Sequence, residues 1–108
     1  MLFRSVVVHG PEQFISGGRP RPDAHEVQRA ARLLAGASRP VIVAGGGTIL
    51  SEASPELVAL AEHLGIPVVT TWMGKGSIPE DHPLNGWSVG DTASTSGNTL
   101  AEIGRAHV

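Results

Sequence analysis

The chain has 108 residues, 41% hydrophobic and 17% charged, which suits one small folded domain rather than a disordered segment. The formal net charge is −2 without basic runs, which argues against binding to nucleic acid or an anionic membrane. No apolar run approaches the roughly 20 residues of a membrane-spanning helix, and no signal peptide is recognisable. The absence of cysteine excludes disulfides and thiolate metal sites, so we expect a soluble, cytoplasmic protein.

Both ends of the chain can be read as translated sequencing adapter. Residues 102–108 fit GAG-ATC-GGA-AGA-GCA-CAC-GTC, one frame of a widely used short-read adapter whose next codon is the stop TGA. Residues 1–5 fit GTG-CTC-TTC-CGA-TCT, the end of the opposite-strand adapter, when GTG is taken as a start codon. We therefore expect residues 1–5 and 102–108 to be adapter-derived, and we leave them out of the fold argument.

A short run, Val6–Val8, could be the end of a strand, and the Gly- and Pro-rich stretch from Gly10 to Pro22 predicts an extended linker. Asp23 is a good N-cap, and Glu26 completes a capping-box pattern. The sequence predicts a helix over Ala24–Ala35 that ends before Gly36. The residues at helical spacing on one face are Val27, Ala30, Ala31 and Leu34.

The middle of the chain alternates between strand and helix patterns. The unbroken apolar run Val41–Ala44 predicts a strand covered on both faces, and Ile66–Thr71 predicts a second one. Between them, Ser54 is expected to cap a helix that has Pro55 at its first position and ends at Gly65. The expected buried stripe of this helix is Leu57, Leu60, Ala61 and Leu64. This order favours an α/β domain built from a right-handed repeat with a parallel sheet.

After Thr71 the sequence predicts mostly irregular structure. Trp72–Ser77 is punctuated by glycines, Ile78–Leu84 is rich in turn residues, and Gly86–Asn98 is mostly small and polar. Asn98 is expected to cap a helix that starts at Thr99. Long irregular stretches inside a compact domain are usually functional or disordered.

The glycine run after the first strand is the strongest candidate for ligand binding. Ligands of open α/β sheets bind at the carboxyl ends of strands, where Gly45, Gly46 and Gly47 would let the backbone approach a phosphate. The alternative is a tight turn that needs positive φ and binds nothing. The Gly-x-Gly-x-x-Gly dinucleotide pattern is not met, because Leu50 stands where its last glycine should be.

The second strand should end beside those glycines if the two strands are neighbours. The residues that would then emerge there are Thr70, Thr71, Trp72, Met73 and Gly74. Hydroxyls and backbone amides there could hold a ribityl or pyrophosphate group, and Trp72 or Met73 could pack on a flat ring. Alternatively, the two large side chains simply close the core. The five histidines lack metal-ligand spacing, His82 is expected to order a turn, and no nucleophile–base pair is visible, so no catalytic or metal-binding residue is assigned.

Three segments carry a resemblance to the central domain of acetohydroxyacid (acetolactate) synthase-like, thiamine diphosphate-dependent enzymes. They are Arg39–Gly47, Leu64–Gly76 and Pro79–Leu84. The resemblance implies that residues 23–101 are part of that domain and that residues 6–22 are the end of the preceding domain and a linker. It also implies a Rossmann-like three-layer α/β fold with a parallel sheet that is incomplete here, so we expect the isolated chain to be marginally stable. It does not separate acetolactate synthases from glyoxylate carboligases or cyclohexanedione hydrolases.

The resemblance also implies the chemistry of a longer parent enzyme. Such enzymes use thiamine diphosphate and Mg²⁺ to decarboxylate a small 2-keto acid and pass the carbanion to a second carbonyl compound, usually as homodimers or tetramers. The activating glutamate and the Gly-Asp-Gly metal motif lie outside this chain, so the fragment alone is not expected to be catalytic. The rivals are a stand-alone nucleotide-binding or regulatory module and a flavin-free hydrolase relative.

In the flavin-containing relatives the central domain binds FAD. Carried over by position, the cofactor contacts would fall on Gly45, Gly46, Gly47, Thr71, Trp72, Met73 and Gly90. After the glycine that matches Gly90, these relatives often have His-Gly-Thr, whereas this chain has Asp91-Thr92-Ala93-Ser94. Both a flavin-binding and a flavin-free parent therefore stay open.

Overall fold

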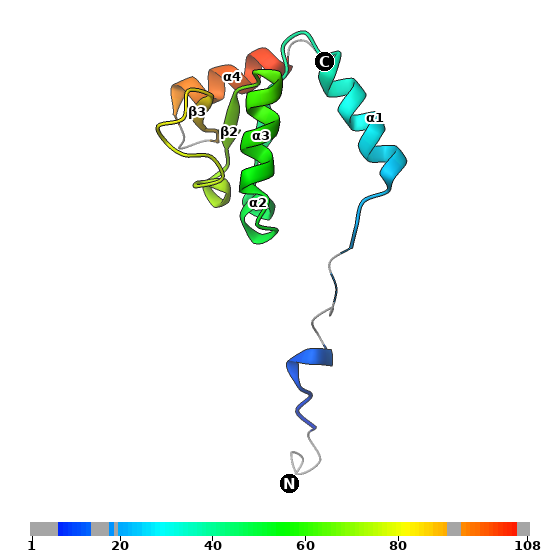
Figure 1. Cartoon of the computed structure of the whole chain (residues 1–108). Coiled ribbons are helices and arrows are strands. Elements are labelled where there is room, and N and C mark those ends of the chain that lie inside the picture. The colour runs from blue at the N-terminus through cyan, green and yellow to red at the C-terminus, as the bar shows by residue number, and fades with distance from the viewer. Residues whose placement is uncertain (1–6, 14–17, 19, 91–93, 106–108) are drawn as a thin grey trace.

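The computed structural model of the chain describes residues 7–13, 18, 20–90 and 94–105. Figure 1 shows the order of the elements, which are η1 (Pro11–Gln13), α1 (Ala24–Ala35), β1 (Ile42–Ala44), α2 (Gly46–Leu50), α3 (Ser54–Leu64), β2 (Val68–Thr70), η2 (Trp72–Gly74), β3 (Asn85–Ser88) and α4 (Thr95–Arg105). None of the helices in these ranges has the length and apolar character needed to cross a membrane.

The strands form one parallel sheet in the order β1-β2-β3. The parallel α/β architecture predicted from the sequence is therefore confirmed. The third strand was not predicted, because its sequence Asn85–Ser88 contains no apolar run. Between Val68 and Thr70 the pairing with β3 shifts register, so β3 carries a bulge around Gly86 and Trp87.

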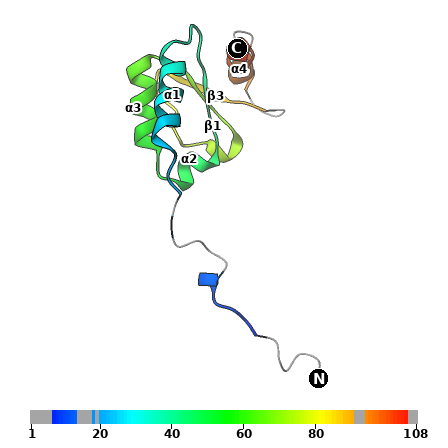
Figure 2. The same cartoon turned by 90° about the vertical axis from the view of Figure 1, so that its right-hand side faces the viewer.

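Figure 2 shows α3 and α4 on opposite sides of the strands. On the α3 side lies the hydrophobic core, formed by the buried residues Ala44, Ala61, Val68 and Ile78 with Ile42, Leu57, Val58 and Leu84 packed against them. The predicted stripe of α3 is wrong at Leu60, which is 41% exposed. Val58 takes its place, because the helix face that meets the sheet is turned by about one residue.

The face of the sheet that carries α4 is covered only in part. Leu100 of α4 packs near Gly86 and Val69, on β3 and β2. β1 lies beyond the reach of this helix, and its Val43 is 54% exposed. The expectation that the first strand is covered on both faces is therefore wrong, whereas β2 is buried along its whole length.

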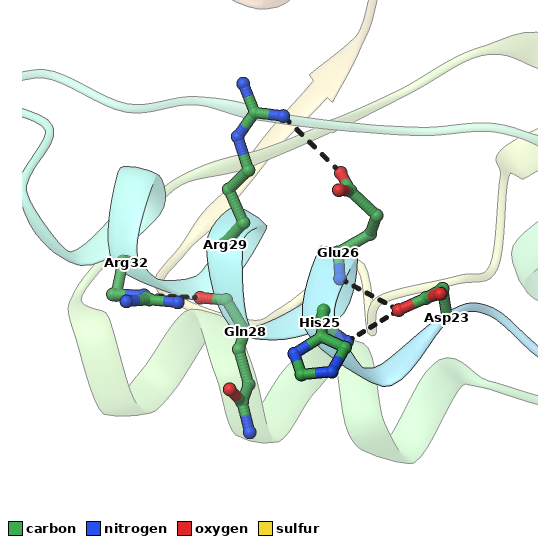
Figure 3. Close-up of polar contacts among 6 residues, drawn as sticks. All are labelled: Asp23, His25, Glu26, Gln28, Arg29 and Arg32. Atoms are coloured by element: carbon green, nitrogen blue, oxygen red, sulfur yellow. Dashed lines mark hydrogen bonds and ion pairs between the residues drawn. The ribbon is translucent and has the colours of Figure 1, made fainter.

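The helix α1 has the predicted bounds but packs differently from a core helix. Asp23 caps it by accepting hydrogen bonds from the backbone N–H groups of His25 (2.7 Å) and Glu26 (3.4 Å), as Figure 3 shows. The Glu26 carboxylate pairs with Arg29 at 3.6 Å. Gly36 ends the helix in a right-handed conformation, with φ −87°. No residue of α1 is buried, and the helix stands apart from the sheet in Figure 1.

Several helix ends differ from the sequence prediction. Ser54 lies inside α3, and Ala53 takes the N-cap position, whereas Gly65 ends this helix with φ 65° as expected. The last helix starts at Thr95 instead of Thr99, because the hydroxyl of Ser94 accepts a hydrogen bond from Gly97 N–H (3.1 Å). Near the N-terminus, Val7 and Val8 are exposed and form no strand; Val6 lies outside the described residues.

His82 fastens the connection before β3 to α3, which confirms its predicted role in a turn. Its Nε2 lies 2.8 Å from Glu62 Oε1, and its Nδ1 accepts a hydrogen bond from Leu84 N–H at 3.1 Å. An accepting Nδ1 places the proton of the neutral ring on Nε2, which donates to Glu62. Both ring nitrogens are therefore used.

We expect His82→Ala to lower the free energy of unfolding by about 1–2 kcal/mol, because it removes both hydrogen bonds and leaves Leu84 N–H without this acceptor. The control is Glu62→Gln, which keeps an acceptor oxygen for Nε2–H and is expected to cost less than about 0.5 kcal/mol. Urea unfolding followed by circular dichroism measures both. Equal losses in the two variants would contradict the role of the Leu84 hydrogen bond.

Candidate functional site

The carboxyl ends of the three parallel strands bring distant segments of the chain to one edge of the sheet. Thr71 N–H donates to Ala44 O at 3.0 Å, which places the start of η2 next to the end of β1. Val89 N–H donates to Thr70 O at 2.9 Å, which places the residues after β3 next to the end of β2. This edge holds all seven residues that the sequence singled out as cofactor contacts.

Four of those residues are brought into contact in pairs. A Cβ atom built on Gly46 would be 2.9 Å from Met73 Cβ, and one built on Gly45 would be 3.8 Å from Thr71 Oγ1. The short helix α2 and the 3-10 turn η2 therefore pack side by side. We expected Gly45–Gly47 (the glycine run) and Thr71–Met73 (the corner) to lie together at one edge of the sheet, and this is confirmed. This edge is called the glycine rim below.

The backbone shows why the run consists of glycines. None of the three glycines has a positive φ, since that conformation occurs among the described glycines only at Gly65, Gly76 and Gly90. These glycines therefore do not serve a turn that needs positive φ, and ligand binding by them stays a prediction. Gly46 is required by the close approach of Met73, but Gly47 has no atom within 4 Å of a built Cβ. Neither conformation nor packing within the described chain requires a glycine at position 47.

The large side chains of the corner face solvent. Trp72 is 58% exposed and Met73 is 78% exposed, so the alternative that they close the core is wrong. The Lys75 ammonium lies 5.2 Å from the centre of the Trp72 ring. Thr71 caps η2 by accepting a hydrogen bond from Gly74 N–H at 3.2 Å. The corner thus offers an aromatic face, a thioether and a hydroxyl at the rim.

Gly90 lies on the same edge but apart from the other six residues. It follows β3, which is separated from β1 by β2, so about 10 Å divides the ends of the two outer strands. Its N–H donates to Asn98 Oδ1 and its carbonyl accepts from Asn98 Nδ2, both at 3.0 Å. No pattern in the sequence indicated this role of Asn98, which was expected to cap a helix. Residues 91–93, part of the departure from the flavin-containing relatives, lie outside the described residues.

A sequence model of the family described as "Thiamine pyrophosphate enzyme, central domain" matches residues 27–103. The chain belongs to this family. The match spans most of the chain, including α3, the sheet and the glycine rim, and it disfavours a stand-alone nucleotide-binding module.

Individual relatives of this thiamine pyrophosphate enzyme central domain agree. A probable acetolactate synthase large subunit of Methanocaldococcus jannaschii is 49% identical over 99 residues, covering 83% of this chain and 17% of that protein. A sulfoacetaldehyde acetyltransferase of Rhodobacter capsulatus is 44% identical over 99 residues, covering 92% of this chain and 17% of that protein. A 3D-(3,5/4)-trihydroxycyclohexane-1,2-dione hydrolase of Geobacillus thermodenitrificans is 38% identical over 84 residues, covering 78% and 13%. The chain thus spans about a sixth or less of the length of these curated relatives.

Proposed function

We propose that the chain is part of the central domain of a thiamine diphosphate- and Mg²⁺-dependent enzyme that decarboxylates and ligates small 2-keto acids, as an acetolactate synthase does. The observation that carries the proposal is the family match over residues 27–103, together with 49% identity to a probable acetolactate synthase large subunit. The named relatives also include an acetyltransferase and a hydrolase, so the reaction of the parent is the point to test.

Within such a parent, this chain would act as a structural and cofactor-binding unit. Thiamine diphosphate, when bound, supplies the electron sink for breaking the bond next to the keto group. None of the residues in the described part of the chain forms a nucleophile–base pair at the glycine rim. The residues there can position a ligand through backbone N–H groups, the Thr71 hydroxyl and the exposed Trp72 and Met73.

The test is to express the 108-residue chain and the complete gene that contains residues 6–101, and to assay both with pyruvate, thiamine diphosphate and Mg²⁺. We expect carbon dioxide release and a ligation product from the complete protein and none from the chain alone. Turnover by the chain alone would contradict the proposal. A hydrolase product from the complete protein would favour the hydrolase relatives instead.

The complete protein is expected to be a cytoplasmic homodimer or tetramer that binds neither nucleic acid nor membranes.

We further propose that the glycine rim contacts FAD in the complete protein. Gly47 supports this, because its missing side chain leaves open space that nothing in the described chain fills. Trp72 and Met73 support it too, because they present exposed apolar surface suited to a flat ring beside that space. Gly90 would contribute its lack of a side chain rather than its N–H, which is already bonded to Asn98.

We expect Gly47→Leu in the complete protein to weaken flavin binding at least about tenfold while leaving the melting temperature near that of the parent, because the new side chain would occupy the ligand space. Flavin absorbance retained after gel filtration measures the effect. The control is Leu50→Ala on the same helix, a side chain that is 79% exposed. Full flavin retention by Gly47→Leu would contradict the contact, and a flavin-free parent protein would refute FAD while leaving the family assignment intact.

The adapter origin of residues 1–5 and 102–108 also stays a proposal. It rests on the in-frame codon matches at both ends. The nucleotide sequence of the source DNA tests it directly. Codons that differ from the adapter at these positions would refute it.

A further inference from the structure

A small cavity lies between the loop after η2 and strand β3. Its volume is about 60 Å³, which is enough for one compact chemical group. None of the seven residues assigned to the flavin lines it. The polar and aromatic residues of its wall are Thr70, Lys75, Glu80, Asn85, Trp87, Ser88 and Ser94.

Thr70 provides the first sign that this cavity binds a ligand. Its side chain is only 6% exposed, and its hydroxyl has no hydrogen-bond partner among the described residues. Among the described residues, every fully enclosed side-chain oxygen or nitrogen has a hydrogen-bond partner. The Thr70 hydroxyl is therefore not fully enclosed, and it opens onto the cavity that Thr70 lines. The hydroxyl can therefore donate a hydrogen bond to an occupant of the cavity, or accept one from it.

Lys75 gives the wall a cation that can meet an anion. The Lys75 ammonium has no carboxylate within ion-pair distance in the described part of the chain, and it lies over the Trp72 ring. Ser88, which pairs with Thr70 across the sheet, adds a second hydroxyl. Glu80 is the negatively charged residue of the wall. Because Glu80 is exposed, water screens its repulsion of a bound anion more than it screens the attraction between that anion and a cation inside the cavity.

Trp87 forms a wall of the cavity in a strained conformation. Its φ is 69°, in the left-handed region that bulky residues avoid. Asn85 Oδ1 holds this conformation by accepting a hydrogen bond from Trp87 N–H at 2.8 Å. Strain of this kind is concentrated at ligand sites, and here it places an indole ring at the cavity.

We propose that this cavity binds a small oxyanion, the phosphate or carboxylate group of a ligand, through the Thr70 and Ser88 hydroxyls and the Lys75 ammonium. The site is distinct from the proposed flavin contacts and does not depend on them. Its selectivity would come from its size, which admits a single such group next to the Trp87 ring.

The test is a titration of the isotope-labelled 108-residue chain with sodium phosphate, and separately with sodium acetate, against sodium chloride at the same ionic strength. We expect saturable shifts of the Thr70 and Ser88 amide signals with phosphate, acetate or both, and none with chloride. Saturation by phosphate alone identifies a phosphoryl ligand, and saturation by acetate alone identifies a carboxylate. Shifts that stay linear, or that chloride reproduces, would refute the site.

Three variants assign the binding to this cavity. Thr70→Val keeps the shape of the side chain and should weaken binding about fivefold, and Lys75→Gln should weaken it about tenfold. Glu80→Gln should tighten binding about threefold, because it removes the repelling charge. A gain in affinity cannot result from unfolding, so this variant keeps the test decisive. Unchanged affinity in all three variants would overturn the proposal.

Discussion

Gly74→Ala is expected to abolish cooperative folding of the isolated chain. A Cβ atom at this position would lie 2.1 Å from Ala44 O, 2.9 Å from Ala44 C and 3.1 Å from Gly45 C. All three are backbone atoms at the end of β1, so no side-chain rotation relieves the clash. The alternative, moving η2 away from β1, breaks the Thr71–Ala44 hydrogen bond. We expect a loss of about 3 kcal/mol in the free energy of unfolding.

A small domain has little stability to spare, so this loss should remove most of the folded population. Thermal unfolding followed by circular dichroism measures it. The matched control is Gly47→Ala, where a new Cβ meets no atom within 4 Å and φ is not positive. Because alanine is the better helix former, this control should change stability by between zero and about 0.5 kcal/mol in the favourable direction. Similar melting curves for the two variants would contradict the packing at the rim.

Ile78→Ala is expected to cost about 3 kcal/mol, within the usual range for a buried isoleucine. Ile78 is 1% exposed although it lies in an irregular segment, and it belongs to the core cluster under α3. It also lines the small cavity next to Thr70, so its removal would enlarge that space. Ile78 therefore anchors the loop that carries Lys75 and Glu80 in the core.

Urea unfolding of Ile78→Ala and Ile78→Val measures how much the buried side chain contributes to the free energy of unfolding. The valine variant removes one methylene group and should cost about 1 kcal/mol. Leu50→Ala serves as the surface control, because that side chain is 79% exposed. If Ile78→Ala were as mild as the Leu50 control, the loop would not be anchored in this way.

The elements built from local signals were predictable from the sequence. Asp23 and the apolar spacing after it located α1, and the β-branched runs located β1 and β2, because capping and burial leave marks within a few residues. β3 escaped prediction, since Gly86 is buried by the close approach of Leu100 rather than by any apolar character of its own.

The candidate site was predictable only where it depended on strand order. Parallel strands bring their carboxyl ends together, so the meeting of Gly46 with Met73 followed from two apolar runs alone. The Thr70 cavity did not follow, because it arises from a bulge and from a left-handed Trp87 that no periodicity indicates. The hydrogen bonds between Asn98 and Gly90 could not be predicted either, since they join a residue of α4 to one that precedes the helix.

The placement of α3 and α4 on opposite faces determines how a larger sheet would grow. Connections between parallel strands are almost always right-handed, so a helix on one face adds strands in one direction and a helix on the other face adds them in the reverse direction. From β1 the sheet extends through α3 to β2 and then to β3. A strand following α4 in a longer protein would therefore join at the free edge of β1, the strand that carries the half-exposed Val43. β1 would then be the central strand where the direction of winding changes, and Gly45–Gly47 would open into the crevice that such a change creates.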